Sequence, residues 1–144
     1  MASSPDGRLL ATGGCNNWVY PSLRHADTEV LLWDAGSLSE RRRIPVPARC
    51  VAQLVFSPDG RWLAGATDWG ATVWDARSGA TLVSFGMAAN GGDWIAWTPD
   101  GRYDGSDNAG RLLAWRRGNE AFPITSLPAQ NRVPGLLARV LRGQ

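Results

Sequence analysis

A tryptophan recurs along this chain at a constant separation. Trp33-Asp34, Trp74-Asp75 and Trp115-Arg116 follow one another at intervals of 41 residues. A fixed period of this length indicates an internal repeat, in which each copy is one small structural unit that packs on its neighbours. We therefore expect related, stacked units rather than one irregular domain.

Each unit also carries a turn signal, Pro-Asp-Gly preceded by Ser or Thr. The three copies span residues 4–7, 57–60 and 98–101, and the last two copies begin 17 residues before their tryptophan. Proline presets φ at the first corner of such a turn, and glycine adopts the left-handed conformation that returns the chain. Short apolar segments with β-branched and aromatic residues lie on either side, so each unit is predicted to be a meander of antiparallel strands.

These motifs resemble those of the WD-repeat β-propeller family over residues 4–118. The resemblance implies an all-β fold, a propeller segment of just under three four-stranded blades with a short C-terminal helix. We assign residues 1–118 to the blades, the first of them incomplete, and residues 119–144 to a final outer strand, a loop and the helix. Because a propeller needs about four to eight blades, the ring has to be completed by missing blades or by self-association.

The apolar segments between the turns predict the positions of the strands. We expect strands at 8–12, 29–34, 41–47, 50–56, 62–66, 71–74, 80–85, 93–97, 102–106, 111–115 and 120–124. Too few residues precede the first turn to form an innermost strand, so this strand is expected to be absent. Residues 134–142 predict a helix that places Leu136, Leu137, Val140 and Leu141 on one face, for docking on the propeller or on a partner.

In the WD-repeat family, the imidazole of a histidine bonds the turn aspartate and is linked to the strand tryptophan through a Ser or Thr. The resemblance assigns Thr67, Asp68 and Trp74 to this network. The segment that follows the second unit, residues 86–92, contains no histidine, so the network is expected to be incomplete. The other positions that define the structural repeat are Trp33, Asp34, Asp75 and Trp115.

The first unit departs from the repeat by 12 extra residues between Gly14 and Asp27. In the family, the corresponding loop opens on the face of the propeller that commonly receives partners. We interpret four residues of this insert as partner-binding: Trp18, Tyr20, Arg24 and His25. The alternative is that Trp18 and Tyr20 fold back on the blade as a longer hairpin, and the sequence leaves both interpretations open.

Charge and composition narrow the classes of partner. The net charge is +2, and all 15 basic residues are arginine, a usage that we interpret as that of a GC-rich bacterial genome. The run at 41–43 neutralises too few phosphates to hold a nucleic acid, and charges on an edge strand prevent unwanted pairing. We therefore expect a protein partner and neither nucleic acid nor membrane. No signal peptide or membrane span is visible, so a cytoplasmic protein is the default expectation.

The residues needed for catalysis are scarce. His25 is the only imidazole, Cys15 and Cys50 lack the spacing of a metal site or of a secreted disulfide framework, and no glycine-rich phosphate loop occurs. We therefore predict no enzymatic activity, no cofactor and no metal.

These observations favour a non-catalytic module for protein–protein interaction or scaffolding. An alternative comes from residues 92–103, Trp115 and residues 134–141, which are similar to the last blade of bacterial WD-repeat proteins. Many of those proteins carry a caspase-like peptidase on the same chain. The alternative is therefore a regulatory or sensor terminal portion of a larger protein of that kind.

Overall fold

The computed structural model describes residues 1–15, 28–89 and 91–143. They form two compact units, Met1–Thr81 and Leu82–Gln144. Most elements are strands in antiparallel sheets, and the described residues contain one short α-helix, so the predicted all-β fold is confirmed. No helix in this part of the chain is long and apolar enough to cross a membrane. The boundary expected after residue 118 stays a prediction.

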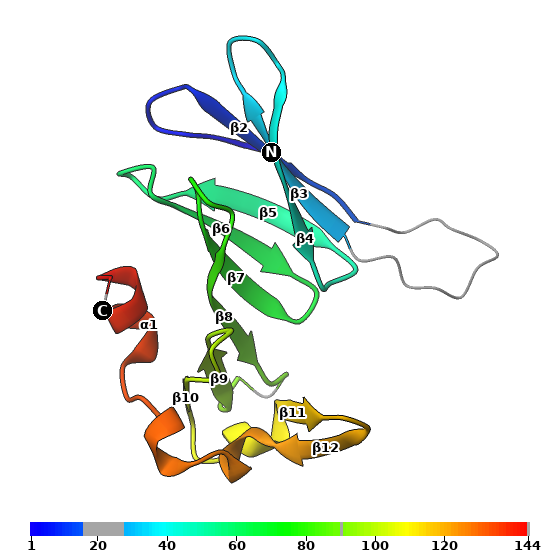
Figure 1. Cartoon of the computed structure of the whole chain (residues 1–144), viewed down its shortest axis with the longest axis vertical. Helices are drawn as coiled ribbons and strands as arrows, with labels where there is room; N and C mark the ends of the chain where they lie inside the picture. The colour runs from blue at the N-terminus through cyan, green and yellow to red at the C-terminus, as the bar shows by residue number, and fades with distance from the viewer. Residues whose placement is uncertain (16–27, 90, 144) are drawn as a thin grey trace, which may run out of the picture. The chain divides into compact units, whose positions relative to one another are not determined.

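The first sheet of unit one is a meander of four strands (Figure 1). These are β1 (Ala2–Ser3), β2 (Leu9–Gly13), β3 (Thr28–Asp34) and β4 (Glu40–Val46), in that order. The expectation that the innermost strand is absent is wrong, because Ala2 and Ser3 pair with Ala11 and Leu10. Two residues before the first turn are enough to form this short edge strand.

The second set of strands in unit one repeats the pattern. It comprises β5 (Val51–Phe56), β6 (Trp62–Thr67) and β7 (Gly70–Asp75), each antiparallel to the next. Alternate side chains of a strand face opposite sides of its sheet, and Val30 and Leu32 of β3 are buried while Leu31 between them is partly exposed. Both sheets contribute to one core, which contains Val30, Leu32, Leu63 and Trp74.

The predicted Pro-Asp-Gly turns share one hydrogen-bonding scheme. In the second copy the Ser57 hydroxyl donates to Asp59 at 2.6 Å, and Asp59 also accepts the backbone N–H of Arg61 at 3.1 Å. Gly60 has φ +69°, which a residue with a side chain rarely adopts. The hydroxyl bond is the main cause of a lowered pKa at Asp59, and the same holds for Asp6 and Asp100 in the other two turns.

The aspartate that follows the repeated tryptophan closes the next hairpin. Asp75 accepts the backbone N–H groups of Arg77 and Ser78 at 3.1 and 2.6 Å and the Ser78 hydroxyl at 2.8 Å. These donors, the Ser78 N–H foremost, lower the pKa of Asp75. Asp34 makes equivalent bonds to Ser37 and an ion pair with Arg41, which lower its pKa strongly. The tryptophan-aspartate pair of the repeat therefore has a local structural role.

Unit two departs from the expected third blade. β8 (Thr81–Met87), β9 (Trp94–Trp97) and β10 (Tyr103–Gly105) are consecutive antiparallel strands, whereas β11 (Ala114–Arg117) pairs with β12 (Glu120–Pro123) in a separate two-stranded sheet. The chain returns instead along β10, where Tyr103 bridges to Arg132 and its carbonyl accepts the N–H of Val133 at 2.7 Å. Because residues 132–133 occupy this edge, β11 does not pair with β10.

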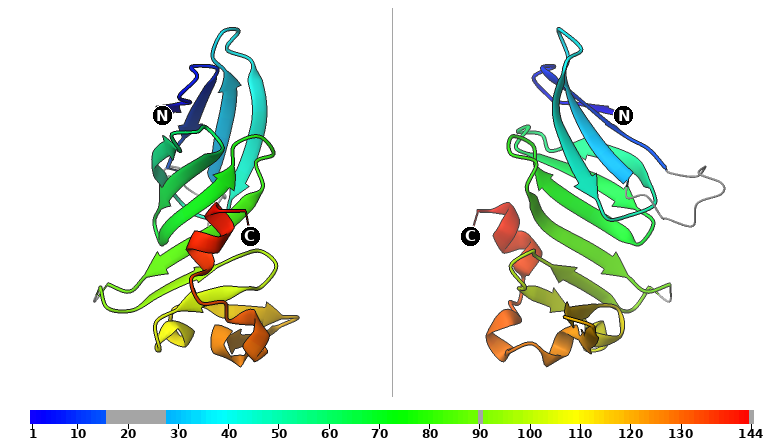
Figure 2. Two further views of the ribbon diagram at one scale, coloured as in Figure 1. Left: turned by 90° about the vertical axis from the view of Figure 1, so that its left-hand side faces the viewer. Right: turned by 45° about the vertical axis from the view of Figure 1, so that its right-hand side comes forward.

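Short helical segments complete unit two. The 3₁₀ turns are Ala109–Arg111, Ile124–Ser126 and Ala129–Asn131, and the helix α1 is Leu136–Leu141. The helix packs against β9 and β10, as the amphipathic pattern predicted (Figure 2). Leu136 is fully buried, while Leu137 remains 38% exposed. The carboxylate of Asp104 accepts the N–H of Gly135 at 2.7 Å and so holds the start of the helix.

Substitution of Gly65 provides a test of how tightly the core of unit one is packed. A Cβ atom placed on Gly65 would lie 2.7 Å from Cζ3 of the buried Trp74, so we expect Gly65→Ala to lower the free energy of unfolding by about 1–3 kcal/mol. Gly14→Ala is the matched control, because no atom lies within 4 Å of the added methyl group. Urea unfolding followed by fluorescence measures both, and equal stabilities would contradict this account of the core.

Candidate interaction site at the root of the long loop

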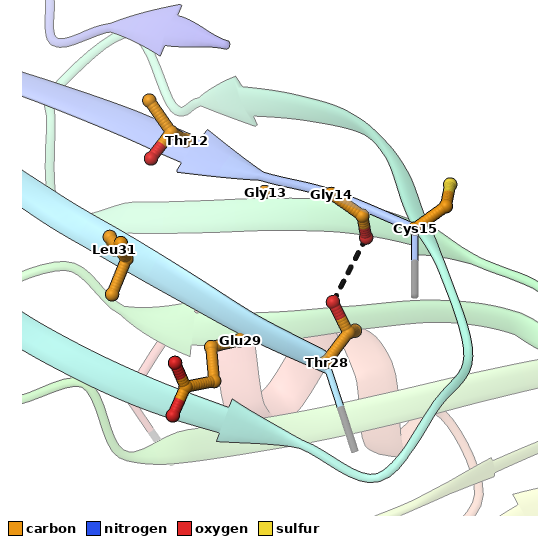
Figure 3. Close-up of a pocket in the computed structure, with 7 residues that line it drawn as sticks. All are labelled: Thr12, Gly13, Gly14, Cys15, Thr28, Glu29 and Leu31. Carbon is orange, nitrogen blue, oxygen red and sulfur yellow. Dashed lines mark hydrogen bonds between the residues drawn. The ribbon is translucent and has the colours of Figure 1, made fainter. Parts of the chain in front are cut away.

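The insert begins and ends at a polar hollow of about 360 Å³ in unit one (Figure 3). The residues that line it are Thr12, Gly13, Gly14, Cys15, Thr28, Glu29 and Leu31. The predicted partner-binding residues, Trp18, Tyr20, Arg24 and His25, belong to residues 16–27 and lie outside the described residues. The structure therefore shows the root of the predicted site.

The carbonyl group of Gly14 joins three strands at this root. It accepts a hydrogen bond from the buried Thr28 hydroxyl at 2.9 Å and another from the backbone N–H of Val51, also at 2.9 Å. Gly13 allows this approach, because a Cβ atom there would lie 3.1 Å from the Cβ of Val51. The end of β2 and the start of β3 are thus fixed to the beginning of β5.

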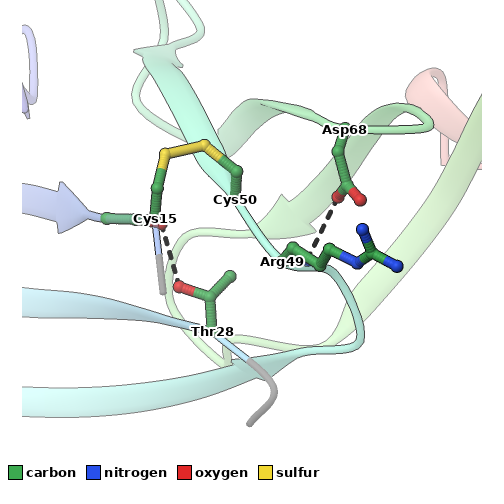
Figure 4. Close-up of a disulfide and its surroundings, with 6 residues drawn as sticks. Cys15, Thr28, Arg49, Cys50 and Asp68 are labelled. Atoms are coloured by element: carbon green, nitrogen blue, oxygen red, sulfur yellow. Dashed lines mark hydrogen bonds between the residues drawn. A yellow bond between two sulfur atoms is a disulfide. The ribbon is translucent and has the colours of Figure 1, made fainter. Parts of the chain in front are cut away.

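A disulfide between Cys15 and Cys50 adds a covalent bond at the same place (Figure 4). The two residues also form an isolated antiparallel bridge, with their Cα atoms 3.9 Å apart. The sequence offers no reason to expect this bond, because the spacing of the cysteines fits neither a metal site nor a secreted disulfide framework. They are 35 residues apart, and their spacing carries no signal for pairing, because they meet only through the packing of one sheet on the next.

The predicted network around Asp68 is present in a different form. Asp68 accepts the backbone N–H of Arg49 at 3.1 Å, so the donor comes from the segment before β5 and not from residues 86–92 (Figure 4). The role expected for Thr67 is also wrong, because its buried hydroxyl has no hydrogen-bond partner among the described residues. The backbone N–H of Arg49 therefore donates to Asp68 in place of the histidine imidazole expected from the resemblance.

The link from a tryptophan to a hydroxyl occurs in the first sheet instead. Nε1 of Trp33 donates to the Thr12 hydroxyl at 2.9 Å. Thr12 lies two residues after Leu10, the residue that pairs with Trp33. In the second sheet, Gly65 lies two residues after Leu63, the residue that pairs with Trp74. Gly65 thus occupies the place of Thr12 in the second sheet, where the Trp74 ring fills the space of a side chain.

Charges near the hollow are paired. Arg43 donates to Glu29 at 2.7 Å and to Glu40 at 3.0 Å, and these carboxylates, Glu40 foremost, raise the pKa of Arg43. The hydroxyls of Thr12 and Thr28 are both occupied in hydrogen bonds. Among the described residues, no three His, Cys, Asp or Glu side chains are placed to hold a metal ion.

Trp115 is the third repeat position, and it too has a local role. Its ring stacks on Phe122 with centroids 5.1 Å apart, and its Nε1 donates to the Ser126 hydroxyl at 3.0 Å. The following residue is Arg116, which bonds Asn119 at 3.2 Å in place of the aspartate scheme of the other copies.

Comparison with known proteins agrees with this repeat architecture. Residues 44–75 match the WD40 family, described as "WD domain, G-beta repeat". This segment is similar to a WD40 repeat. It runs from β4 to the end of β7 and contains Asp68, Trp74 and Asp75. The fold around it is all-β, built of antiparallel meanders.

Two relatives share parts of the sequence. The chain is 39% identical over 80 residues to small ribosomal subunit protein RACK1z of Arabidopsis thaliana, a match that covers 54% of this chain and 20% of that protein. It is 35% identical over 146 residues to Centriole proteome protein 16 of Chlamydomonas reinhardtii, covering 80% of this chain and 7% of that protein. The chain thus spans one fifth or less of either relative. Both are eukaryotic, so they give the expectation of a bacterial source no support.

One solved structure is similar over most of the chain. The Myceliophteria thermophila Cps50 (Swd1) β-propeller domain is 20% identical, with a TM-score of 0.48, over 70% of this chain and 31% of that one.

The disulfide makes a direct prediction. Replacement of both cysteines by serine, Cys15→Ser with Cys50→Ser, removes the cross-link, and we expect the free energy of unfolding to fall by about 2–4 kcal/mol. Urea unfolding with and without a reducing agent measures the effect. The reducing agent should destabilise the natural chain and leave the double variant unchanged. A natural chain that reacts with a thiol reagent before reduction would show that the bond does not form.

Proposed function

We propose that this protein is a non-catalytic WD-repeat module for protein–protein interaction or scaffolding, with the insert between β2 and β3 as its contact loop. The observation that carries the proposal is the root of this loop. The Cys15–Cys50 disulfide and the bond from the Val51 N–H to Gly14 fix the first side of the insert to a neighbouring sheet, and the Thr28 hydroxyl joins its second side to Gly14.

A loop held in this way suits recognition. Binding residues concentrate on loops that a rigid scaffold positions, because the scaffold bears the cost of ordering while the loop sequence varies. Trp, Tyr and Arg are the residues that contribute most at protein interfaces, and the insert contains Trp18, Tyr20 and Arg24. The name of the relative RACK1z places that protein in the small ribosomal subunit, an assembly of many chains, and a role in an assembly is in keeping with our proposal.

The absence of catalysis is part of the proposal. The polar groups of the hollow are already paired with one another, and the weak net charge of +2 offers little attraction to nucleic acid.

The test is a paired substitution in the loop. We expect Trp18→Ala with Tyr20→Ala to abolish capture of a protein partner from an extract of the source cells, with binding of the purified partner then measured by calorimetry. Val55→Ala, which changes a side chain that is 57% exposed on β5, is the control and should bind normally. If the folded double variant binds with unchanged affinity, the loop is not the contact surface.

We further propose that the propeller ring is completed by other chains or by further blades. The sheets of this chain provide fewer than the roughly four blades of the smallest propellers. Two copies would give about six blades and three copies about eight to nine, and an unclosed ring leaves apolar sheet faces in water. Light scattering on a sizing column should give a stable dimer or trimer if copies of this chain close the ring. A stable, soluble monomer over a wide range of concentration would exclude closure by self-association.

The alternative proposal is a regulatory or sensor portion of a larger WD-repeat protein linked to a caspase-like peptidase. Its support is the likeness of residues 92–103 and 134–141 to the last blade of such proteins. Neither of the relatives compared above is named as a peptidase, so the interaction module is the proposal that we favour.

A further inference from the structure

A second hollow, of about 450 Å³, lies in unit two between the strands and the start of α1. Its wall is almost entirely apolar, and it is lined by Phe85, Met87, Gly91, Trp94, Asp104, Gly135, Leu137 and Ala138. The volume falls within the range of about 300–1,000 Å³ that small-ligand sites occupy. The helix forms one wall because Leu136 is buried against the sheet while Leu137 turns toward the hollow.

Two aromatic rings form part of the wall. The rings of Phe85 on β8 and Trp94 on β9 are stacked, with centroids 6.0 Å apart and planes at 23°. The face of an aromatic ring carries negative charge density, and tryptophan attracts cations more strongly than the other aromatic residues do. The thioether of Met87, whose side chain is 57% exposed, adds a polarisable group at the same wall.

The only ionised group among the residues that line the hollow is a carboxylate. Asp104 accepts the backbone N–H groups of Gly105 at 2.9 Å and Gly135 at 2.7 Å, and it takes part in none of the ion pairs of the described residues. Amide donors stabilise a carboxylate without cancelling its charge. Asp104 is partly exposed, so its charge is accessible to a cation from the solvent.

The side chain of the nearby Arg132 bonds to groups other than Asp104. Arg132, on the segment that pairs with β10, donates to the carbonyl of Gly105 at 3.2 Å and lies 3.8 Å from the carboxylate of Asp107. Its guanidinium therefore does not neutralise Asp104. The hollow combines aromatic faces, an apolar wall and an uncompensated carboxylate.

We propose that this hollow binds an organic cation with an apolar body, in which an alkylammonium group lies against Phe85 and Trp94 with its charge toward Asp104. The same chemistry is available from a free quaternary ammonium compound or from an alkylated lysine side chain of a protein. The proposal rests on unit two alone and is independent of the contact loop.

Titration of the full chain with matched probes tests it. Choline and 3,3-dimethylbutan-1-ol have the same shape, and only choline is charged, so we expect choline to bind at least tenfold more tightly in calorimetry or NMR titrations. A peptide containing trimethyllysine, compared with the same peptide containing norleucine, tests the second source. If either cation binds more tightly than its neutral partner, the proposal is supported and the source is identified. If each neutral probe binds as tightly as its cation, or if neither cation binds, the proposal is overturned.

Substitutions locate the binding. Asp104→Asn keeps one oxygen to accept from Gly135 and removes the charge together with the acceptor for Gly105. We expect it to weaken cation binding about tenfold without changing the circular dichroism spectrum. Glu120→Gln removes an exposed carboxylate from β12, outside the hollow, and should have no effect. Trp94→Leu keeps an apolar wall, and it should weaken binding of the cation more than binding of the neutral isostere. Unchanged affinity in folded Asp104→Asn would show that the carboxylate plays no part.

Discussion

Unit one depends on the close approach of the end of β2 to the beginning of β5. Three successive residues make it: Gly13 leaves room for Val51, the Gly14 carbonyl accepts the Val51 N–H, and Cys15 bonds to Cys50. The approach joins two sheets that each bury only one side of their strands here, and so creates the core shared by Val30 and Trp74. Strand pairing alone would not achieve this, since an isolated meander exposes its apolar face.

The strands were predictable because their signals are local. A Pro-Asp-Gly turn with its Ser or Thr contains all the donors and acceptors that it needs, as Ser57, Asp59 and Arg61 show. The contacts at the root of the long loop could not be predicted in this way. Cys15 with Cys50, Arg49 with Asp68 and Trp33 with Thr12 join residues that are 19 to 35 positions apart, and only packing brings them together.

The third repeat shows how tertiary context overrides a local pattern. Its sequence retains the turn and the tryptophan, yet Arg116 replaces the aspartate that closes the hairpin in the other copies. Residues 132–133 pair with Tyr103 and take the edge that the next strand would have used. The hairpin of β11 and β12 therefore forms on its own, stabilised by the stacking of Trp115 on Phe122. The predicted number of strands is correct here while one predicted pairing is not.

The two hollows differ in whether their charged and polar side chains are already paired within the chain. This difference is why we propose a ligand for only one of them. At the root of the loop, Thr12, Thr28 and Glu29 are each bonded to a neighbour within the chain, so the hollow gains little from a ligand. Beside α1, the Asp104 carboxylate accepts from two backbone amides and lines the same hollow as Phe85 and Trp94. The carboxylate suits the anchor, because a negative acceptor at the start of a helix is favoured over a neutral one. The same charge at the rim of an apolar hollow is what a bound cation would meet, so one aspartate can serve both the fold and a ligand.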